Sequence, residues 1–453
     1  MKNLCLALFL GAMALTDSRA DVQLPGEDGQ KPALGCAPFP SRLHAFVWRN
    51  WTVVPQARLA EVLKTTPEKV SQVAASMGLS PQGAIQDEWK NKGYITVLRR
   101  NWHLLPYDQL MAVLGLSREQ LRYALMEDDF LFIKLGSIKP KCEPLVYAPP
   151  TPDENAAAKK IADWLHTEGV TASPPEPEEP RFAFMNALAQ PDPAITASKS
   201  SETSPFELRF IFSYFANYGD PLLDPGVTSY PEGLLQRLAA AGVNGVWVHT
   251  VLRTLAKDPA FPEFGAESEK RIEGLRTLVA RAKKYGIDVY LYLNEPRSMP
   301  TAFFEVRPER APMRGVEAAG NSACLCTSNP EVRRWMSDAL ASVFTQVPGL
   351  GGVFTITASE NPTSCASHGK QLKCERCKDR PYAEMIAEVN ATISQGVARG
   401  NPKAKTIVWD WGWNDAHAAA IIAHLPKTCW FMSVSEWSLP IERGGVKSNV
   451  GEY

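Results

Sequence analysis

Short apolar runs alternate with amphipathic segments through the second half of the chain. Six runs suit buried parallel strands, over residues 208–215, 245–251, 288–293, 351–357, 406–409 and 429–434. Between them apolar residues recur at helical spacing, as in Ile272, Leu275, Leu278, Val279 and Ala282. Glycine or proline stands where four of these helices should end, at Gly242, Gly286, Pro348 and Pro402. The pattern predicts an α/β fold, with about six βα units of a (β/α)8-type TIM barrel.

Two units of such a barrel are missing from the pattern. A six-stranded parallel sheet left open would expose its edges and an unfilled interior. We therefore expect the sequence to be a fragment of a longer protein or a truncated product. The rival fold is a doubly wound open sheet, which would bind ligands where the strand order reverses.

The first half of the chain carries an internal repeat at an offset of 51 residues. Arg49-Asn50-Trp51 recurs as Arg100-Asn101-Trp102, and the register continues downstream. Each copy predicts two short amphipathic helices, the second starting at Thr66-Pro67-Glu68 or at Ser117-Arg118-Glu119. We expect four regions: a signal peptide (1–20), a duplicated, mainly helical domain (36–142), a Pro- and Ser-rich linker (143–205) and the partial barrel (206–453).

Three interpretations of the repeated domain stay open. Its helix, turn and helix resemble a DNA-binding helix-turn-helix, and the second copy, Tyr94 to Leu135, faintly resembles a cell-wall-binding LysM module. The third interpretation is a scaffold or spacer. Cys36 and Cys142 bracket both copies and offer one disulfide around them.

Charge and targeting narrow the class of protein. The formal net charge of −1 over 453 residues argues against a nucleic-acid or anionic-membrane partner, which both need clustered positive charge. Lys2, the apolar run from Leu4 to Leu15 and Ser18-Arg19-Ala20 together predict a cleaved signal peptide. The apolar run is too short to span a bilayer. We expect a secreted or periplasmic protein without membrane insertion and without an organic cofactor.

Acidic and aromatic residues gather where the predicted strands end. In a barrel, these carboxyl ends share one rim and bind the ligand. Indole faces stack on the CH groups of sugar rings, while carboxylates bind hydroxyls and transfer protons. The residues predicted at this rim, strand by strand, are Tyr218 and Asp220, His249, Asn294 and Glu295, Glu360, Trp409, Asp410 and Trp411, and Glu436 and Trp437.

From about residue 206 onward, the chain resembles the barrel of hexosaminidase-like glycoside hydrolases and their α-glucuronidase-like relatives, among them large exported bacterial proteins. In hexosaminidases an Asp-Glu pair closes the fourth strand, and the Glu is the general acid. Here Ser359-Glu360 stands at that place, so the Glu is kept and the Asp is not. The residues that carry the resemblance are Tyr218-Gly219-Asp220-Pro221, Tyr292-Leu293-Asn294-Glu295-Pro296, Ser359-Glu360-Asn361, Cys374-Glu375-Arg376-Cys377 and Trp409-Asp410-Trp411-Gly412-Trp413.

Glycoside hydrolysis requires a proton donor and a second carboxylate. We predict Glu360 as the acid, with Glu295 and Asp410 as further catalytic candidates. The substrate-binding candidates are Tyr218, Asp220, His249, Asn294, Trp409, Trp411, Glu436 and Trp437. Glu295 can equally bind a sugar hydroxyl or pair with Arg297. The alternative function is a non-catalytic carbohydrate-binding or scaffold protein on the same fold.

A cluster of cysteines follows Glu360. Cys365, His368, Cys374 and Cys377 have the spacing of a structural zinc site, and Cys326 in the preceding strand loop offers a replacement ligand. Disulfides and free thiols remain alternatives, because an exported protein meets oxidising conditions. A bound metal ion or a disulfide would each hold the loop that carries Glu360.

Overall fold

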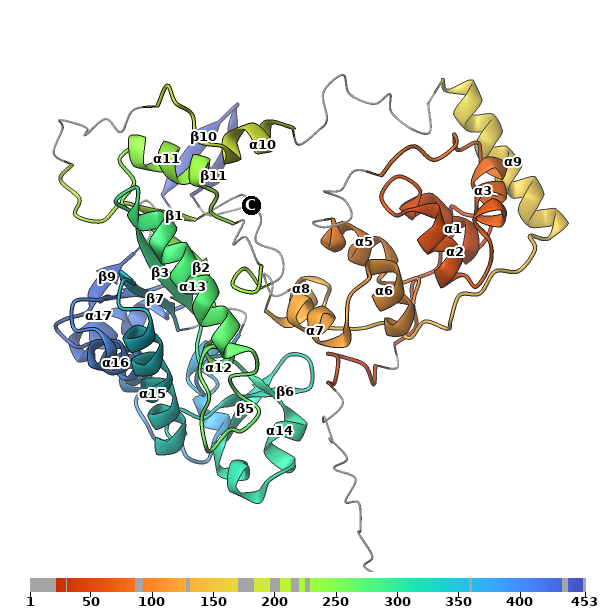
Figure 1. The fold of residues 1–453 in the computed structure, drawn as a ribbon. Helices are drawn as coiled ribbons and strands as arrows, with labels where there is room; N and C mark the ends of the chain where they lie inside the picture. The colour runs from red at the N-terminus through yellow and green to blue at the C-terminus, as the bar shows by residue number, and fades with distance from the viewer. Residues whose placement is uncertain are drawn as a thin grey trace, which may run out of the picture.

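The computed structural model describes most of the chain. The strand and helix pattern is observed in the second half, and a separate helical region forms the first half (Figure 1). The described residues are 22–29, 31–85, 93–127, 131–169, 183–195, 204–212, 220–224, 229–357, 361–433 and 439–450.

The second half is built on a six-stranded parallel sheet. Its strands lie side by side in chain order, β1-β2-β3-β7-β8-β9, and every neighbouring pair is parallel. This order without reversal confirms a curled sheet of partial-barrel type over a doubly wound one, whose strand order reverses. The strands are β1 (Phe210–Phe212), β2 (Gly245–His249), β3 (Asp288–Leu293), β7 (Gly352–Ile356), β8 (Lys405–Trp409) and β9 (Trp430–Met432).

The alternation of side chains gives the sheet two different faces. On β3, Val289, Leu291 and Leu293 pack into the large core shared with the helices. Tyr290 and Tyr292 point to the opposite, inner face, where they join Trp247 and Phe354. The inner face is therefore aromatic, and it carries the residues that lead to the rim.

Helices pack on the outer face in the order expected of βα units (Figure 1). Two of them end at glycines with positive φ, Gly242 at +84° and Gly286 at +69°, as their position in the sequence predicts. The helices are α11 (Glu232–Ala240), α12 (Leu252–Leu255), α13 (Ser268–Lys283), α15 (Pro330–Gln346), α16 (Tyr382–Gly400) and α17 (Asp415–His424).

A small antiparallel sheet projects from the loop after β3, and the sequence pattern did not indicate it. Its strands are β4 (Met299–Pro300), β5 (Arg314–Ala318) and β6 (Ser322–Leu325), in the order β4-β6-β5. The same loop holds α14 (Thr301–Glu305) and η1 (Pro308–Met313), while the loop after β7 holds η2 (Ser367–Gly369) and η3 (Gln371–Lys373). The last described elements are the strands of the hairpin β10 (Pro440–Arg443) and β11 (Val446–Asn449).

The helical region has its own core, centred on residues such as Phe46 and Trp102. The two predicted start signals are confirmed, since α3 begins after Thr66 and α7 after Ser117, the latter with a full capping box. Its helices are α1 (Arg42–Asn50), α2 (Gln56–Val62), α3 (Pro67–Ser76), α5 (Tyr94–Asn101), α6 (Tyr107–Leu114), α7 (Arg118–Met126), α8 (Leu131–Lys134) and α9 (Pro152–Thr167), with α10 (Ala183–Ala189) beyond.

Equivalent positions of the two predicted repeats contact each other across this core. The side chains of Asn50 and Asn101 donate to one another, at 2.9 and 2.7 Å. Arg49 and Arg100 likewise each donate to the backbone carbonyl of the other. These contacts agree with a duplication, which itself remains a prediction.

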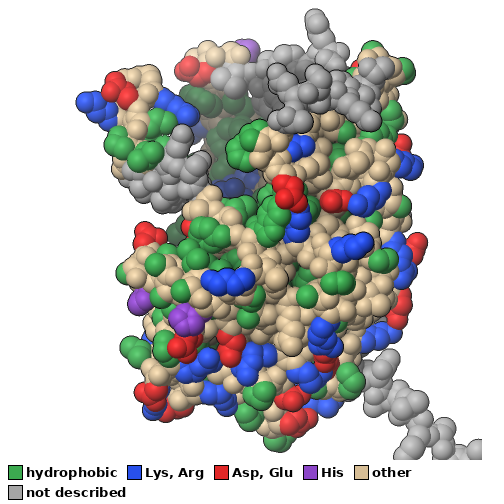
Figure 2. Space-filling view, turned by 90° about the vertical axis from the view of Figure 1, so that its left-hand side faces the viewer, with side chains coloured by type: hydrophobic (Ala, Val, Ile, Leu, Met, Phe, Trp, Pro, Cys, Tyr) green, Lys and Arg blue, Asp and Glu red, His purple; other side chains and the backbone are tan. Residues whose placement is uncertain are grey.

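The disulfide expected between Cys36 and Cys142 is wrong, because both are free thiols. The Cys142 sulfur instead lies against the carbonyl oxygens of Trp102 and Pro140. Among the described helices, none is long and apolar enough to cross a membrane. On the face drawn in Figure 2, basic and acidic side chains are intermixed over the lower part, and hydrophobic side chains border a hollow above.

Candidate functional site

The carboxyl ends of the parallel strands form one edge of the sheet, and most of the predicted site residues lie along it. Four of the predicted site residues, Tyr218, Glu360, Glu436 and Trp437, fall outside the described residues, and so does the predicted signal peptide, 1–20.

Glu295 is buried just beyond β3, with 1% of its surface exposed. One carboxylate oxygen accepts the backbone N–H of Leu252 at 2.7 Å, and the other accepts the backbone N–H of Arg297 at 2.9 Å. Burial raises the pKa of Glu295 to about 7, against the smaller opposing effects of the Arg297 charge and the backbone N–H groups. Glu295 therefore joins the loops after β2 and β3, and it exchanges a proton near neutral pH.

Arg297 occupies the centre of a buried polar network above β2 and β3. Its guanidinium donates to the Asn294 side-chain oxygen at 2.8 Å and to His249 Nε2 at 2.6 Å. Since Arg297 can only donate, His249 Nε2 is the acceptor and His249 is neutral. Burial, and then the charge of Arg297, lower the pKa of His249 to about 3. The Asn294 amide nitrogen donates to Ile356 in β7, so both ends of this side chain are used.

The carboxylate that balances Arg297 comes from the helical region. Glu127, at the end of α7, lies 2.9 Å from Arg297 Nε and 2.7 Å from Arg253 Nη2, and 4% of its side chain is exposed. Burial alone would raise the pKa of Glu127, but the guanidinium groups of Arg297, Arg253 and Arg122 lower it to about 2. Glu127 is thus ionised at any physiological pH.

Sequence analysis missed Glu127, Arg253 and Arg297 as a group. Glu127 and Arg253 are 126 residues apart, and no local pattern links them. The one available signal was that Arg253 and Arg297 each follow a predicted strand end, as binding residues of barrels do.

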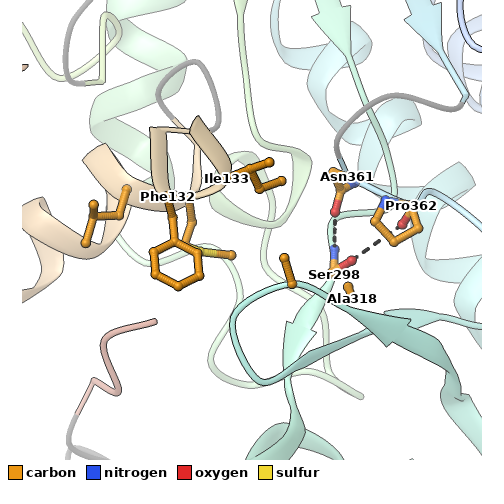
Figure 3. A pocket seen from close by; sticks show the side chains of 9 residues that line it. Phe132, Ile133, Ser298, Ala318, Asn361 and Pro362 are labelled. Atoms are coloured by element: carbon orange, nitrogen blue, oxygen red, sulfur yellow. Dashed lines mark hydrogen bonds between the residues drawn. The ribbon is translucent and has the colours of Figure 1, made fainter. Parts of the chain in front are cut away.

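Close packing surrounds this inter-region contact. A narrow pocket of about 20 Å³ separates Phe132 and Ile133 of α8 from Ser298, Asn361 and their neighbours beyond β3 and β7 (Figure 3). Such a space has room for about one water molecule and not for a sugar ring. In Figure 3 the backbone N–H of Ser298 donates to the Asn361 side chain, at 2.9 Å, which joins the two strand loops.

Asp220, predicted as a substrate-binding residue, lies beyond β1 and pairs with α13. Its carboxylate is 2.6 Å from Arg271 Nε and also accepts the backbone N–H of Leu222. Both partners of the ion pair are largely buried, with 13% and 10% of their side chains exposed. Asp220 therefore fixes the chain onto α13.

The carboxyl end of β8 is more open. Trp409 and Trp411 are half-buried, with ring centroids 5.4 Å apart, and Trp409 adjoins Phe354 on the inner face. The buried Nε1 of Trp409 has no hydrogen-bond partner within the described part of the chain. Asp410, between the two indoles, is half-buried and accepts the Ser433 hydroxyl at 2.5 Å. This end therefore presents stacking surface and a carboxylate acceptor together.

Four buried cysteines converge near the same edge of the sheet. The Sγ atoms of Cys326, Cys365, Cys374 and Cys377 all lie within 4.8 Å of one another. Cys326 follows β6, and the other three lie between β7 and α16. His368, which the spacing also offered as a ligand, is exposed and lies outside this group of four.

The thiol geometry fits a tetrahedral metal. Zinc–sulfur bonds of about 2.3 Å place the sulfur atoms about 3.8 Å apart. Cys326 Sγ is 3.5 Å from Cys377 Sγ and 4.0 Å from Cys374 Sγ, too far for any disulfide. The cluster can therefore hold a metal ion such as zinc, with no position left for a substrate.

Gly315 in β5 belongs to this centre although it carries no side chain. A Cβ at this position would lie 2.6 Å from Cys324 Sγ and 2.7 Å from Cys365 Sγ. Only glycine lets β5 approach the thiols so closely.

Comparison with known proteins gives no family. No protein-family model matches the chain, and no curated protein matches it. Among solved structures, matches include a GH138 enzyme targeting pectin rhamnogalacturonan II (16% identity, TM-score 0.32), a GH89 enzyme from Clostridium perfringens in complex with GlcNAc-α-1,4-galactose (14%, 0.35) and a chitobiase from Flavobacterium johnsoniae (14%, 0.31).

These matches are partial on both sides. They cover 48%, 52% and 47% of this chain, which in turn spans 23%, 29% and 32% of the three structures. The matched proteins are glycoside hydrolases, but TM-scores this low do not establish a shared substrate or mechanism.

Proposed function

We propose that this protein is a secreted, carbohydrate-active protein of glycoside-hydrolase type, and that it binds its glycan at the carboxyl end of β8. The observation that carries the proposal is the group of Trp409, Asp410 and Trp411. Two half-buried indoles offer faces for sugar CH groups. Asp410 supplies the acceptor beside them.

Hydrolysis at this place would need two carboxylates. Our proposed acid is Glu360, because it follows β7, the strand that lies between β3 and β8 in the sheet. Asp410 is the proposed second carboxylate. Glu295 has a pKa of about 7, which suits an acid, but both of its oxygens accept backbone N–H groups. We therefore assign Glu295 the role of a positioning residue for the loops after β2 and β3.

A non-catalytic carbohydrate-binding protein is the second candidate. The observation in its favour is that two of the predicted acidic residues, Asp220 and Glu295, are engaged in structural contacts. Binding through the indoles of β8 would not require either of them.

One set of variants distinguishes a glycoside hydrolase from a non-catalytic carbohydrate-binding protein. The chain is screened with aryl glycosides and polysaccharides, for both turnover and binding, together with Glu360→Gln and Asp410→Asn. Asp415→Asn, an exposed carboxylate at the start of α17, is the matched control. We expect Glu360→Gln and Asp410→Asn to lose turnover by at least about a hundredfold, the usual contribution of a general acid or base, while glycan binding persists. Undiminished turnover in both variants would contradict the catalytic assignment.

We also propose that the four cysteines hold a structural zinc ion. The sulfur-only donor set and the 3.5 and 4.0 Å spacings support this assignment. Native mass spectrometry should find one zinc per chain, lost in Cys377→Ser and kept in Cys429→Ser, whose half-buried thiol lies outside the group. Metal-free wild-type protein would exclude it. Export itself is tested by sequencing the mature N-terminus, expected at Asp21.

A further inference from the structure

The contact of Glu127 with the sheet edge has the form of a bound ligand. A carboxylate from a separately packed region reaches the loops beyond the carboxyl ends of β2 and β3 and meets the guanidinium groups of Arg253 and Arg297. His249, which hydrogen-bonds Arg297, lies on the aromatic inner face, with its ring 5.5 Å from that of Tyr292. Glu127 thus occupies the mouth of the partial barrel, where barrels bind their ligands.

The charges at this place favour an anion. Among the described residues, Glu127 interacts electrostatically with the guanidinium groups of Arg297 and Arg253 at the sheet edge, and with that of Arg122, which stands on α7 beside it. His249 adds no charge because it is neutral, and Glu295 is only partly ionised at neutral pH. Buried guanidinium groups need a carboxylate partner, and their planar donors suit one geometrically.

The site is prepared independently of Glu127. Arg297 is held by Asn294 and His249, and Asn294 is held in turn by β7. Arg253 stands on α12, whose first backbone N–H, that of Leu252, is fixed by Glu295. The sheet edge thus positions the guanidinium groups, and Glu127 enters from outside.

We propose that Arg253 and Arg297, oriented by His249 and Asn294, form a carboxylate-binding site for an acidic glycan, and that Glu127 fills this site in place of the uronic acid group of the ligand. This inference rests on the proposed function and names its substrate class. The carboxylate would enter the β2–β3 side of the mouth while sugar rings stack on the β8 side. The helical region is then displaced when the glycan binds.

The test uses a charged glycan and its uncharged counterpart. Tetragalacturonate and its methyl ester are titrated calorimetrically into the wild-type chain, Glu127→Gln and Glu119→Gln, an exposed carboxylate on the same helix. A site filled by Glu127 more than nine-tenths of the time weakens the apparent affinity at least about tenfold. We expect Glu127→Gln to bind tetragalacturonate at least tenfold more tightly than wild type, with no change for the methyl ester or in Glu119→Gln. Equal affinities in wild type and Glu127→Gln would overturn the proposal.

The outcome also separates this inference from the proposed function. Binding of neutral oligosaccharides without preference for tetragalacturonate would overturn the carboxylate site and leave the proposed function standing. Absence of binding by either class in every variant would remove both.

Because Glu127→Gln also lowers stability, a second measurement uses the unaltered chain. Amide hydrogen exchange of residues 118–127 and 131–134 is compared with and without saturating tetragalacturonate. Displacement of Glu127 should speed exchange there several-fold, whereas the methyl ester should leave it unchanged. Unchanged or slower exchange with tetragalacturonate would overturn the displacement.

Discussion

The two ends of the strand edge differ in how their polar groups are used. Beyond β2 and β3, Asn294, Glu295 and Arg297 are buried and bonded to neighbouring protein groups. Beyond β8, Trp409 and Asp410 are half-buried, and the indole Nε1 has no partner within the described chain. Residues of the chemically active types thus stand at both ends. The polar groups beyond β2 and β3 are bonded within the protein, whereas the β8 end keeps indole surface partly exposed.

Stability should separate the two ends most strongly. Glu127→Gln leaves two largely buried guanidinium groups without their carboxylate, so we expect it to lower the free energy of unfolding by about 3 kcal/mol. Asp410→Asn loses one hydrogen bond and should cost about 1 kcal/mol or less. Denaturant unfolding measures both. Similar losses of unfolding free energy in the two variants would mean that the β8 end contributes as much to stability as the β2–β3 end.

Gly315 tests the cysteine centre that lies between the two ends. Gly315→Ala adds a Cβ within 2.7 Å of two thiols and should cost about 2 kcal/mol through overpacking, with a loss of bound zinc. Gly35→Ala, where nothing lies within 4 Å, is the control. Thermal unfolding and elemental analysis give the two readouts, and an unchanged zinc content in Gly315→Ala would mean that Gly315 is not needed for the metal site.

The pH dependence of stability should come from the β2–β3 end. The pKa of His249 falls from 6.5 to about 3 on folding, so its contribution is complete above pH 6.5 and is lost as the pH falls toward 3. The pKa of Glu295 rises from 4.5 to about 7, so its contribution is present below pH 4.5 and is lost as the pH rises through 7.

Two variants isolate these slopes. His249→Gln should reduce the loss of unfolding free energy at acid pH, by at most about 1.4 kcal/mol per pH unit. Glu295→Gln should likewise reduce the loss of unfolding free energy as the pH rises toward 7. Unfolding free energies at pH 3 to 8 measure both. If neither variant alters the pH profile, these two groups are not the ones that titrate on folding.

Trp409 gives the smallest expected effect and the most direct test of the β8 end. Trp409→Ala removes one stacking face and should weaken glycan binding by about 1 kcal/mol, or roughly fivefold. Phe431→Ala, an exposed aromatic on the neighbouring strand, should leave affinity unchanged. Equal weakening by both variants would move the glycan away from Trp409.

The sheet could be predicted from sequence because its signals are local. Runs of apolar residues fixed β3 at its observed bounds, 288–293, and Gly242 and Gly286 marked helix ends through their left-handed backbone. The residues beyond the strand ends were also predicted from local signals, because they directly follow the apolar runs. The cysteine group was found by spacing, although the fourth ligand, Cys326, is separated from Cys365 by a whole βα unit.

The network around Glu127 could not be predicted, because it depends on how two separately packed regions meet. Local patterns place Glu127 at a helix end and Arg297 in a loop. Neither pattern indicates that the two side chains are in contact. The sheet β4-β6-β5 was missed because its strands are only two to five residues long and none is a long apolar run.

The reciprocal bonds between Asn50 and Asn101 have a consequence for how the helical region responds to change. A surface that contacts its own equivalent is self-complementary, as in a two-fold symmetric dimer. Replacing either asparagine breaks both bonds at once, so the second replacement should cost far less than the first. One half of this region is, in effect, the partner subunit of the other, joined to it by a peptide chain.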